Sequence, residues 1–224
     1  MPLWSQLAVV PALVNTRSEY DHLFSIYVPI AIGVFVLIVI VVVGSVVVFR
    51  RRPVERAARW HENNLLEGSY AVLLACVAAF LLYLTFTAEH RVDTVANRER
   101  PAVTVDVTAS KWEWTFTYPA YGFSVHSGTV GRQPLVVPAN EPVRFNITSV
   151  DVIHSFWIPA LRYKHDAIPG STQVATLLFS KGVFPGQCAE FCGLRHADMT
   201  FTAYGVSPAA FMAWAHGKGR GQTP

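Results

Sequence analysis

Two long stretches without a charged residue constrain the fold of this chain more than any other feature. They cover residues 26–49 and 68–87. At 1.5 Å per residue, these stretches form helices of about 36 Å and about 30 Å. The hydrocarbon core of a bilayer is roughly 30 Å thick, so each helix is long enough to cross it. The sequence therefore predicts a two-helix transmembrane hairpin over residues 26–90, surrounded by membrane lipid.

The segment between the two stretches is strongly basic. It contains two glutamates, Glu55 and Glu62, and five arginines: Arg50, Arg51, Arg52, Arg56 and Arg59. Because basic loops stay on the cytoplasmic side of a membrane, we expect this connector to be cytoplasmic. Residues 1–25 and everything after residue 87 then lie outside. No basic residue precedes the apolar patch near the N-terminus, so we expect an external N-terminal segment and no cleavable signal.

The rest of the chain has the pattern of a separate β domain. Residues 91–100 are polar and charged, and we expect an extended linker there. From residue 101 to 216, short alternating stretches are separated by Pro, Gly and Asn, a pattern typical of an all-β sandwich or Greek-key barrel. A final helix is predicted from Pro208 to about Ala215, and a flexible tail over residues 217–224. The predicted strands are 103–108, 112–118, 135–138, 143–148, 174–179 and 201–204.

Metal-binding residue types are concentrated near the end of this domain. Cys188, Cys192, His196 and Met199 lie within twelve residues. Thiolate, thioether and imidazole ligands together favour copper, whereas Mg²⁺ and Ca²⁺ prefer oxygen ligands. Single-copper loops of this composition take a second histidine from an earlier strand end, and His154 is the candidate. The sequence therefore predicts a copper site.

The second cysteine sets this segment apart from a loop that holds one copper ion, because two thiolates four positions apart could bridge a pair of ions. Each residue alone has another interpretation. Cys188 and Cys192 could form a disulfide outside the cytoplasm. His154 could be an ordinary core or surface histidine, and Met199 could be an apolar residue that fills a gap. The combination of all these residues favours copper.

The spacing of these residues resembles the dinuclear copper (CuA) site of cytochrome c oxidase subunit II. Residues 154–157 and 166–170 also match that family in order. The resemblance implies a cupredoxin-like Greek-key domain in which the cysteines bridge both coppers and each histidine holds one. The methionine would cap one copper, and the glutamate carbonyl would cap the other. The implied copper ligands are His154, Cys188, Glu190, Cys192, His196 and Met199.

The same resemblance implies a function within a complex. The chain would be subunit II of a terminal heme-copper oxidase in a bacterial-type plasma membrane, with its copper domain on the outer side. It would accept electrons from cytochrome c and pass them to heme in subunit I, where oxygen is reduced to water as protons are translocated. Subunit III is a further implied partner. The free carboxylate of Glu190 would reach a Mg²⁺ ion shared with subunit I.

Two tryptophans lie on one predicted strand of the β domain. The segment from Lys111 to Trp114 resembles the family segment whose first tryptophan is exposed above the copper and receives the electron. This role transfers to Trp112, whereas Trp114 is expected to pack in the core. Glu113 departs from the family, which usually has an aromatic residue there.

Glu67 lies at the start of the second apolar stretch. It fits a capping box with Asn64 at the helix N-terminus. The surrounding segment also resembles the family segment whose glutamate marks the entrance of a proton path into subunit I. The family's following Trp and Pro are absent here, so both interpretations remain open for Glu67.

The charge of the chain bears on its partners. The formal net charge of +3 is too small and too scattered to indicate nucleic-acid binding. From residue 101 onward, the sequence contains nine Lys or Arg residues and seven Asp or Glu residues. No clustered negative surface is therefore expected. A basic soluble cytochrome c is steered by such a surface. A membrane-tethered donor would need less attraction, because tethering raises its local concentration.

Two other functions are alternatives for a chain with these features. A quinol oxidase subunit II keeps the hairpin and the β domain as a structural part but lacks the copper ligands, which are present here. A membrane-anchored copper-delivery protein of the thioredoxin-like kind would need a βαβ pattern around the cysteines, which is missing. No Cys-x-x-Cys-His motif is present, so no covalently attached heme c is expected on this chain.

Overall fold

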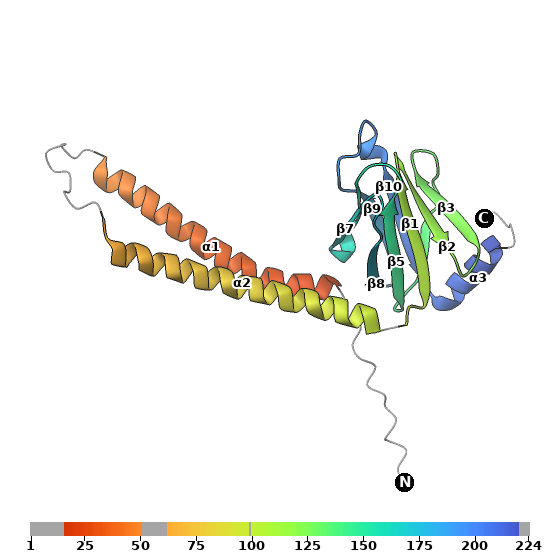
Figure 1. Ribbon diagram of the computed structural model, residues 1–224, viewed down its shortest axis with the longest axis horizontal. Helices are drawn as coiled ribbons and strands as arrows, with labels where there is room; N and C mark the ends of the chain where they lie inside the picture. The colour runs from red at the N-terminus through yellow and green to blue at the C-terminus, as the bar shows by residue number, and fades with distance from the viewer. Residues whose placement is uncertain (1–15, 51–61, 99, 220–224) are drawn as a thin grey trace, which may run out of the picture. The chain divides into compact units, whose positions relative to one another are not determined.

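The computed structural model describes residues 16–50, 62–98 and 100–219. The chain divides into two compact units (Figure 1). One unit, Tyr20–Glu89, contains most of the two long helices, and the other contains the β domain. The basic connector over residues 51–61 and most of the predicted N-terminal segment lie outside the described residues.

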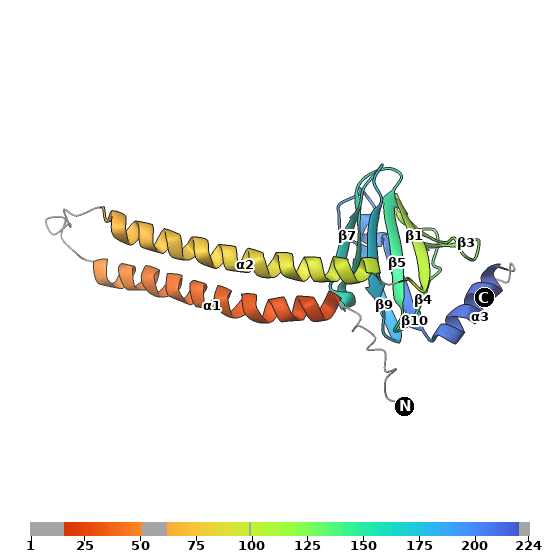
Figure 2. The same ribbon diagram turned by 60° about the horizontal axis from the view of Figure 1, so that its bottom comes forward.

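The two apolar stretches form long helices, α1 (Thr16–Phe49) and α2 (Asn64–Arg98). They run side by side in both views (Figures 1 and 2). The hydroxyl of Tyr27 in α1 donates to the carbonyl oxygen of Leu81 in α2 at 2.7 Å and lies 2.6 Å from the Thr85 hydroxyl. Both helices are long and apolar enough to cross a membrane. The predicted pair of apolar helices is therefore confirmed, and it fits a membrane protein.

Both helices are longer than predicted. α1 begins at Thr16, ten residues before the uncharged stretch, within the segment expected to be external. α2 continues to Arg98, so the prediction of an extended linker at residues 91–100 was wrong for most of its length. The sequence from residue 88 to 98 contains no Pro or Gly to stop the helix. The next proline after this segment is Pro101, which disfavours helical geometry at the residue before it and lacks the N–H that would continue the helix.

The first turn of α2 is capped by Asn63, one residue earlier than predicted. The side-chain oxygen of Asn63 accepts the backbone N–H of Leu66 at 3.0 Å, and its carbonyl oxygen accepts that of Glu67 at 2.9 Å. The predicted capping box with Asn64 was therefore wrong, because Glu67 lies one position beyond the third helical residue that such a box requires. An asparagine that caps the N-terminus of a helix in this way stabilises the helix by about 1 kcal/mol.

The β domain is a sandwich of two five-stranded sheets. In spatial order, the first sheet contains β3 (Phe123–Gly128), β2 (Glu113–Tyr118), β1 (Val103–Ser110), β5 (Pro142–Ser149) and β8 (Gln173–Leu178). The second contains β4 (Leu135–Pro138), β10 (Thr200–Val206), β9 (Gly182–Cys188), β6 (His154–Ile158) and β7 (Tyr163–Ala167). The predicted all-β sandwich is confirmed.

All six predicted strands are present within two residues of their expected ends, but four others were missed: β3, β6, β7 and β9. In β9, Pro185 and Gly186 interrupt the alternation of apolar residues. Gly186 is required there because a Cβ atom would collide with the ring of Phe201. The missed strands depend on contacts with neighbouring strands, which a local pattern does not reveal.

The core lies between the two sheets and is rich in aromatic rings. Trp114 and Phe116 of β2 pack against Phe156 of β6 and Phe201 of β10, and the last two rings stack at 4.8 Å. All four side chains are buried. The final helix, α3 (Pro208–Gly219), runs beyond the predicted end into the first residues of the expected tail. The core thus continues directly beneath the predicted copper site, because Trp114 also contacts the ring of His154.

Candidate metal centre

The candidate metal ligands come together at one end of the second sheet. β6 and β9 are neighbours, with Phe156 opposite Cys188. His154 at the start of β6 therefore lies beside Cys188 at the end of β9. The chain between Cys188 and Met199 is a loop whose ends are joined, since the backbone N–H of Cys188 donates to the Met199 carbonyl oxygen at 2.9 Å. Sheet pairing thus closes the loop that carries the remaining candidates.

Two free thiols lie at the middle of this group. The sulfur atoms of Cys188 and Cys192 are 3.9 Å apart, and neither cysteine is in a disulfide. A disulfide needs a separation of about 2.05 Å. The two sulfurs are therefore close enough to share metal ions but are not bonded to each other.

Four further donors surround the sulfurs in two sets. Nδ1 of His154 lies 3.8 Å from the sulfur of Cys188, and the Glu190 carbonyl oxygen lies 3.2 Å from the same sulfur. Nδ1 of His196 lies 3.5 Å from the sulfur of Cys192, and the Met199 sulfur lies 3.9 Å from it. The structure brings all six predicted positions together. Glu190 takes part through its backbone, and its side chain is exposed.

The group is largely closed to solvent. His154 and Met199 are fully buried, and Cys188 and Cys192 are 3% and 4% exposed. His196 is only partly buried. The ligand atoms of His154, Cys188 and Cys192 all lie within 4.8 Å of one another, which is close enough for one ion to contact all three.

The environment ionises one thiol and keeps the other protonated. Burial opposes ionisation of Cys188, but hydrogen bonds with His154 and with nearby backbone groups lower its pKa to about 6. Burial and then the negative charge of Cys188 raise the pKa of Cys192 to about 12. A metal cation would remove the repulsion between two thiolates, because metal binding favours the deprotonated form of its ligands.

Asp151 supports the site in a way the sequence did not reveal. Its carboxylate accepts the Nε2–H of His154 at 2.9 Å and the backbone N–H of Lys111 at 2.7 Å. These bonds outweigh burial, so the pKa of Asp151 is lowered, and that of His154 is raised by its bonds to Cys188 and Asp151. Fixing one ring nitrogen of His154 presents the other to a metal. In the sequence, the only indication of this role was an acidic residue three positions before a candidate histidine ligand.

The two tryptophans of the predicted strand have different environments. The indole of Trp112 packs against Gly193, the residue that follows Cys192, with its nearest atoms 3.5 Å from the position a Cβ atom of Gly193 would take. Trp114 is fully buried, as predicted, and its N–H donates to the Met199 carbonyl oxygen at 3.4 Å. Both rings therefore contact the loop of ligands, one from the partly exposed side and one from the core.

Glu113 and Glu67 are not part of the metal group. Glu113, which stands where an aromatic residue was expected, forms an ion pair with His126 at 3.1 Å and accepts the backbone N–H of Gly131 at 3.3 Å. It therefore attaches the loop between β3 and β4 to the start of β2, next to Trp112. Glu67 lies in the first turn of α2, outside the β domain.

The donor set fits copper. Two thiols, two imidazoles, a thioether and a carbonyl form a soft, nitrogen- and sulfur-rich group, whereas Mg²⁺ and Ca²⁺ require oxygen cages. Zn²⁺ also binds thiolate and imidazole, but rarely thioether. The chemistry of the residues thus favours the copper identity expected from the sequence.

Comparisons with known proteins agree on one family. Residues 124–206 match a family model described as "Cytochrome C oxidase subunit II, periplasmic domain". A probable cytochrome c oxidase subunit 2 of Rickettsia bellii is 30% identical, over 89% of this chain and 78% of its own length. The cytochrome c oxidase subunit 2 of Cereibacter sphaeroides is 30% identical, over 90% and 76% respectively.

A solved structure matches the β domain. The periplasmic domain of subunit II of cytochrome oxidase from Bradyrhizobium japonicum is 31% identical, with a TM-score of 0.53, and the match covers 56% of this chain and 99% of that one. This similarity confirms the predicted cupredoxin-like fold after the two helices.

Proposed function

The chain belongs to the cytochrome c oxidase subunit II family, and from this premise we propose that it is the subunit through which electrons enter a terminal heme-copper oxidase. It accepts electrons from a cytochrome c at a dinuclear copper centre and delivers them to heme in subunit I. One observation carries this proposal. Two free thiols lie 3.9 Å apart, and each has a histidine Nδ1 within 4 Å of its sulfur.

The six donors would hold the two ions as the family resemblance implies. Cys188 and Cys192 would bridge them, and each histidine would hold one. When bound, such a pair supplies a one-electron centre with its charge shared between two copper ions. The chain contributes a nearly closed site whose ligands are fixed by strand pairing, by Asp151 and by the core beneath. Little movement of these residues is needed when charge changes.

Trp112 is proposed as the residue that receives the electron from the donor. Its indole is partly exposed and packs on Gly193. Gly193 follows Cys192 directly in the chain. The indole therefore packs on the residue next to one of the two cysteines proposed to bridge the copper ions. Its packing supports this role.

Two further roles rest on the family resemblance. The Glu190 carbonyl faces Cys188, which leaves the exposed carboxylate available to a Mg²⁺ ion shared with subunit I. Glu67 is proposed to lie at the entrance of a proton path on the cytoplasmic side. Asn63 caps α2, so the Glu67 carboxylate is not needed for that purpose, and it has no ion-pair partner among residues 16–50, 62–98 and 100–219.

Copper content and spectra of the purified full-length chain test the proposal. We expect two copper ions per chain and an electron paramagnetic resonance pattern from one unpaired electron shared by two equivalent nuclei. Cys192→Ser should abolish that pattern, because only one bridging sulfur remains. A single copper ion would favour copper delivery, and a folded chain without copper affinity would favour a structural subunit. Either result would overturn the proposal.

A further inference from the structure

The outward face of the second sheet carries no charged side chain over β9 and β10. Every second residue of these strands is buried in the core, so the residues between them point outward. The outward residues pair across the two strands: Val183 with Tyr204, Pro185 with Thr202, and Gln187 with Thr200. Val183 is 58% exposed and Tyr204 is 39% exposed. This area, the β9–β10 face, is therefore a neutral surface with apolar side chains open to solvent.

A pocket of about 260 Å³ lies in the β9–β10 face. On one side it is bordered by Pro159, the first residue of the 3₁₀ helix η2 (Pro159–Leu161) that follows β6. Thr200 and Thr202 of β10 border the other side, and Pro185 of β9 lies between them. All the described residues that line this pocket are uncharged.

The neutral surface continues along β10 to α3. A second pocket, of about 340 Å³, lies between Tyr204 and Val206 of β10 and Trp214 of α3. Lys218, near the end of α3, is the one charged residue among the described residues that line it. The two pockets therefore lie along one row of outward β10 side chains.

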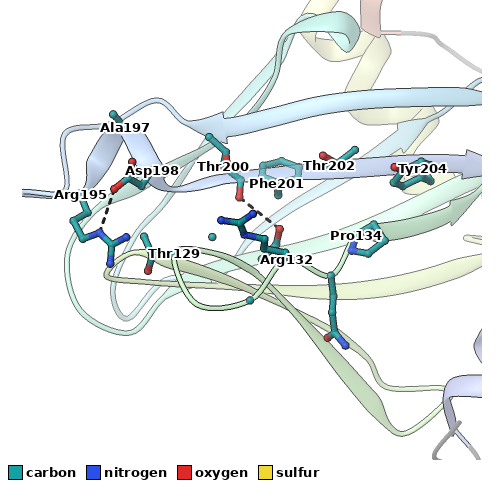
Figure 3. A pocket seen from close by; sticks show the side chains of 14 residues that line it. Thr129, Arg132, Pro134, Arg195, Ala197, Asp198, Thr200, Phe201, Thr202 and Tyr204 are labelled. Atoms are coloured by element: carbon teal, nitrogen blue, oxygen red, sulfur yellow. Dashed lines mark hydrogen bonds and ion pairs between the residues drawn. The ribbon is translucent and has the colours of Figure 1, made fainter. Parts of the chain in front are cut away.

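Charged side chains mark where this surface ends, toward the ligand loop. Figure 3 shows a third pocket, of about 570 Å³, at the start of β10. It is lined by Arg132, Arg195 and Asp198, and the last two form an ion pair at 3.2 Å. The neutral surface therefore extends from η2 to α3, away from these charges.

The chain reaches the domain beside the first pocket. The hydroxyl of Thr16, the first residue of α1, donates to the Leu161 carbonyl oxygen at 3.0 Å. The Arg17 guanidinium donates to the Ala160 carbonyl oxygen at 3.4 Å. Both carbonyl groups belong to η2, and this end of α1 belongs to the same compact unit as the β domain. Residues 1–15 are therefore joined to the domain at the border of the pocket.

The sequence of residues 1–15 suits a neutral surface. It contains no Lys, Arg, Asp or Glu and includes Leu3, Trp4 and the apolar stretch 7–14. As a helix it would measure about 22 Å, less than the roughly 30 Å of a bilayer core. Pro11 also disfavours a continuous helix. A second transmembrane use of this apolar segment is therefore disfavoured.

The segment is also long enough to cover the face. Fifteen extended residues reach at most about 50 Å. The strands β6, β9, β10 and β4 span three strand spacings, about 14 Å. Because the segment is tethered at Thr16, its local concentration at the face is high, which favours it over a separate protein.

We propose that residues 1–15 fold back over the β9–β10 face and place apolar side chains in its two pockets. The inference does not depend on copper and goes beyond the proposed function. The docked segment adds a second attachment between α1 and the β domain, beside the covalent connection through α2. This attachment limits how far the domain can turn about that connection.

Photo-cross-linking in the full-length chain, in membranes, tests the proposal. Thr202 is replaced by p-benzoylphenylalanine, which bonds on illumination to groups that lie against it. We expect trypsin to release a cross-linked peptide that ends at Arg17, the first Lys or Arg of the chain. The same probe in place of Ser124, which is exposed on the first sheet, should not bond to that peptide.

A charge in the segment should weaken the contact. Val10→Glu should lower the yield of the Thr202 cross-link by about tenfold, because an unpaired carboxylate is buried at high cost. Val174→Glu is the matched control, because Val174 is exposed on β8 of the first sheet, and the yield should stay unchanged. Equal losses in the two variants would overturn the proposal.

Other occupants of the face give different products. A mixture of isotope-labelled and unlabelled chains distinguishes a cross-link within one chain from a cross-link between two copies. Bonding to a second copy, to another subunit or to no peptide would overturn the proposal, as would an intact mass that lacks residues 1–15. Each of these results leaves the copper content, and so the proposed function, to be decided separately.

Discussion

Asp151 offers the most direct test of how this structure builds its candidate metal site. Its carboxylate accepts three N–H groups: those of His154 at 2.9 Å, Lys111 at 2.7 Å and Val152 at 2.6 Å. Asp151→Ala removes all three bonds. His154 then loses the group that fixes its ring orientation, and the loop before Trp112 loses its anchor.

The expected changes in copper affinity and in unfolding free energy follow from the number of these bonds and the exposure of the Asp151 side chain. Removing a partner that orients a metal-ligating histidine typically lowers metal affinity about 10- to 100-fold. The Asp151 side chain is 30% exposed, so water replaces part of what is lost. We therefore expect unfolding to become easier by about 2 kcal/mol, near the value of one hydrogen bond to a charged group.

A second variant separates the two functions of the carboxylate. In Asp151→Asn, the amide oxygen can still accept from His154 and Val152, but the amide nitrogen faces the N–H of Lys111 and cannot accept it. We expect copper affinity close to that of the unchanged chain, with a lower melting temperature.

Copper affinity is measured by competition with a chelator, and folding by thermal melting of the metal-free chain. If Asp151→Ala binds copper as tightly as the unchanged chain, Asp151 does not position His154. If Asp151→Asn loses as much affinity as Asp151→Ala, the hydrogen bond to His154 is not the cause.

Two further predictions concern the core and the thiols. Gly186→Ala places a methyl group against the Phe201 ring, so we expect a loss of about 1–3 kcal/mol in a denaturant titration, and a stability equal to that of the unchanged chain would contradict this packing. In the metal-free chain, ultraviolet thiolate absorbance should rise by one thiolate as pH passes about 6, because the lowered pKa of Cys188 deprotonates it first. The second rise should wait until about pH 12, because burial and the charge of Cys188 raise the pKa of Cys192, and two equal steps near the ordinary thiol pKa would contradict this prediction.

The fold was predictable wherever one local property dominates. The absence of charge over residues 26–49 and 68–87 was sufficient to predict α1 and α2. The helix ends were harder, because α2 stops near Pro101 and not at the last apolar residue. In the β domain, alternation predicted strands such as β1 and β5 but missed β9, where Gly186 is selected by a contact with Phe201.

The candidate site was predictable for a different reason. Metal ligands are chemically restricted, so six constrained positions at fixed spacing indicated which residues would come together. Asp151 was not predictable, because an acidic residue near a histidine is common and only the loop between β5 and β6 brings its carboxylate to Nε2.

The loop of ligands takes its shape from the sandwich more than from its own sequence. Its two ends continue into β9 and β10, which pair with Gln187 opposite Thr200, and the bond from Cys188 to Met199 closes it. Trp114 supports the closure from the core through its bond to the Met199 carbonyl oxygen. The position of Met199 relative to Cys188 is therefore set by strand register before any metal arrives. A change that shifts β10 against β9 would move Met199 away from Cys188 even though every candidate ligand was retained.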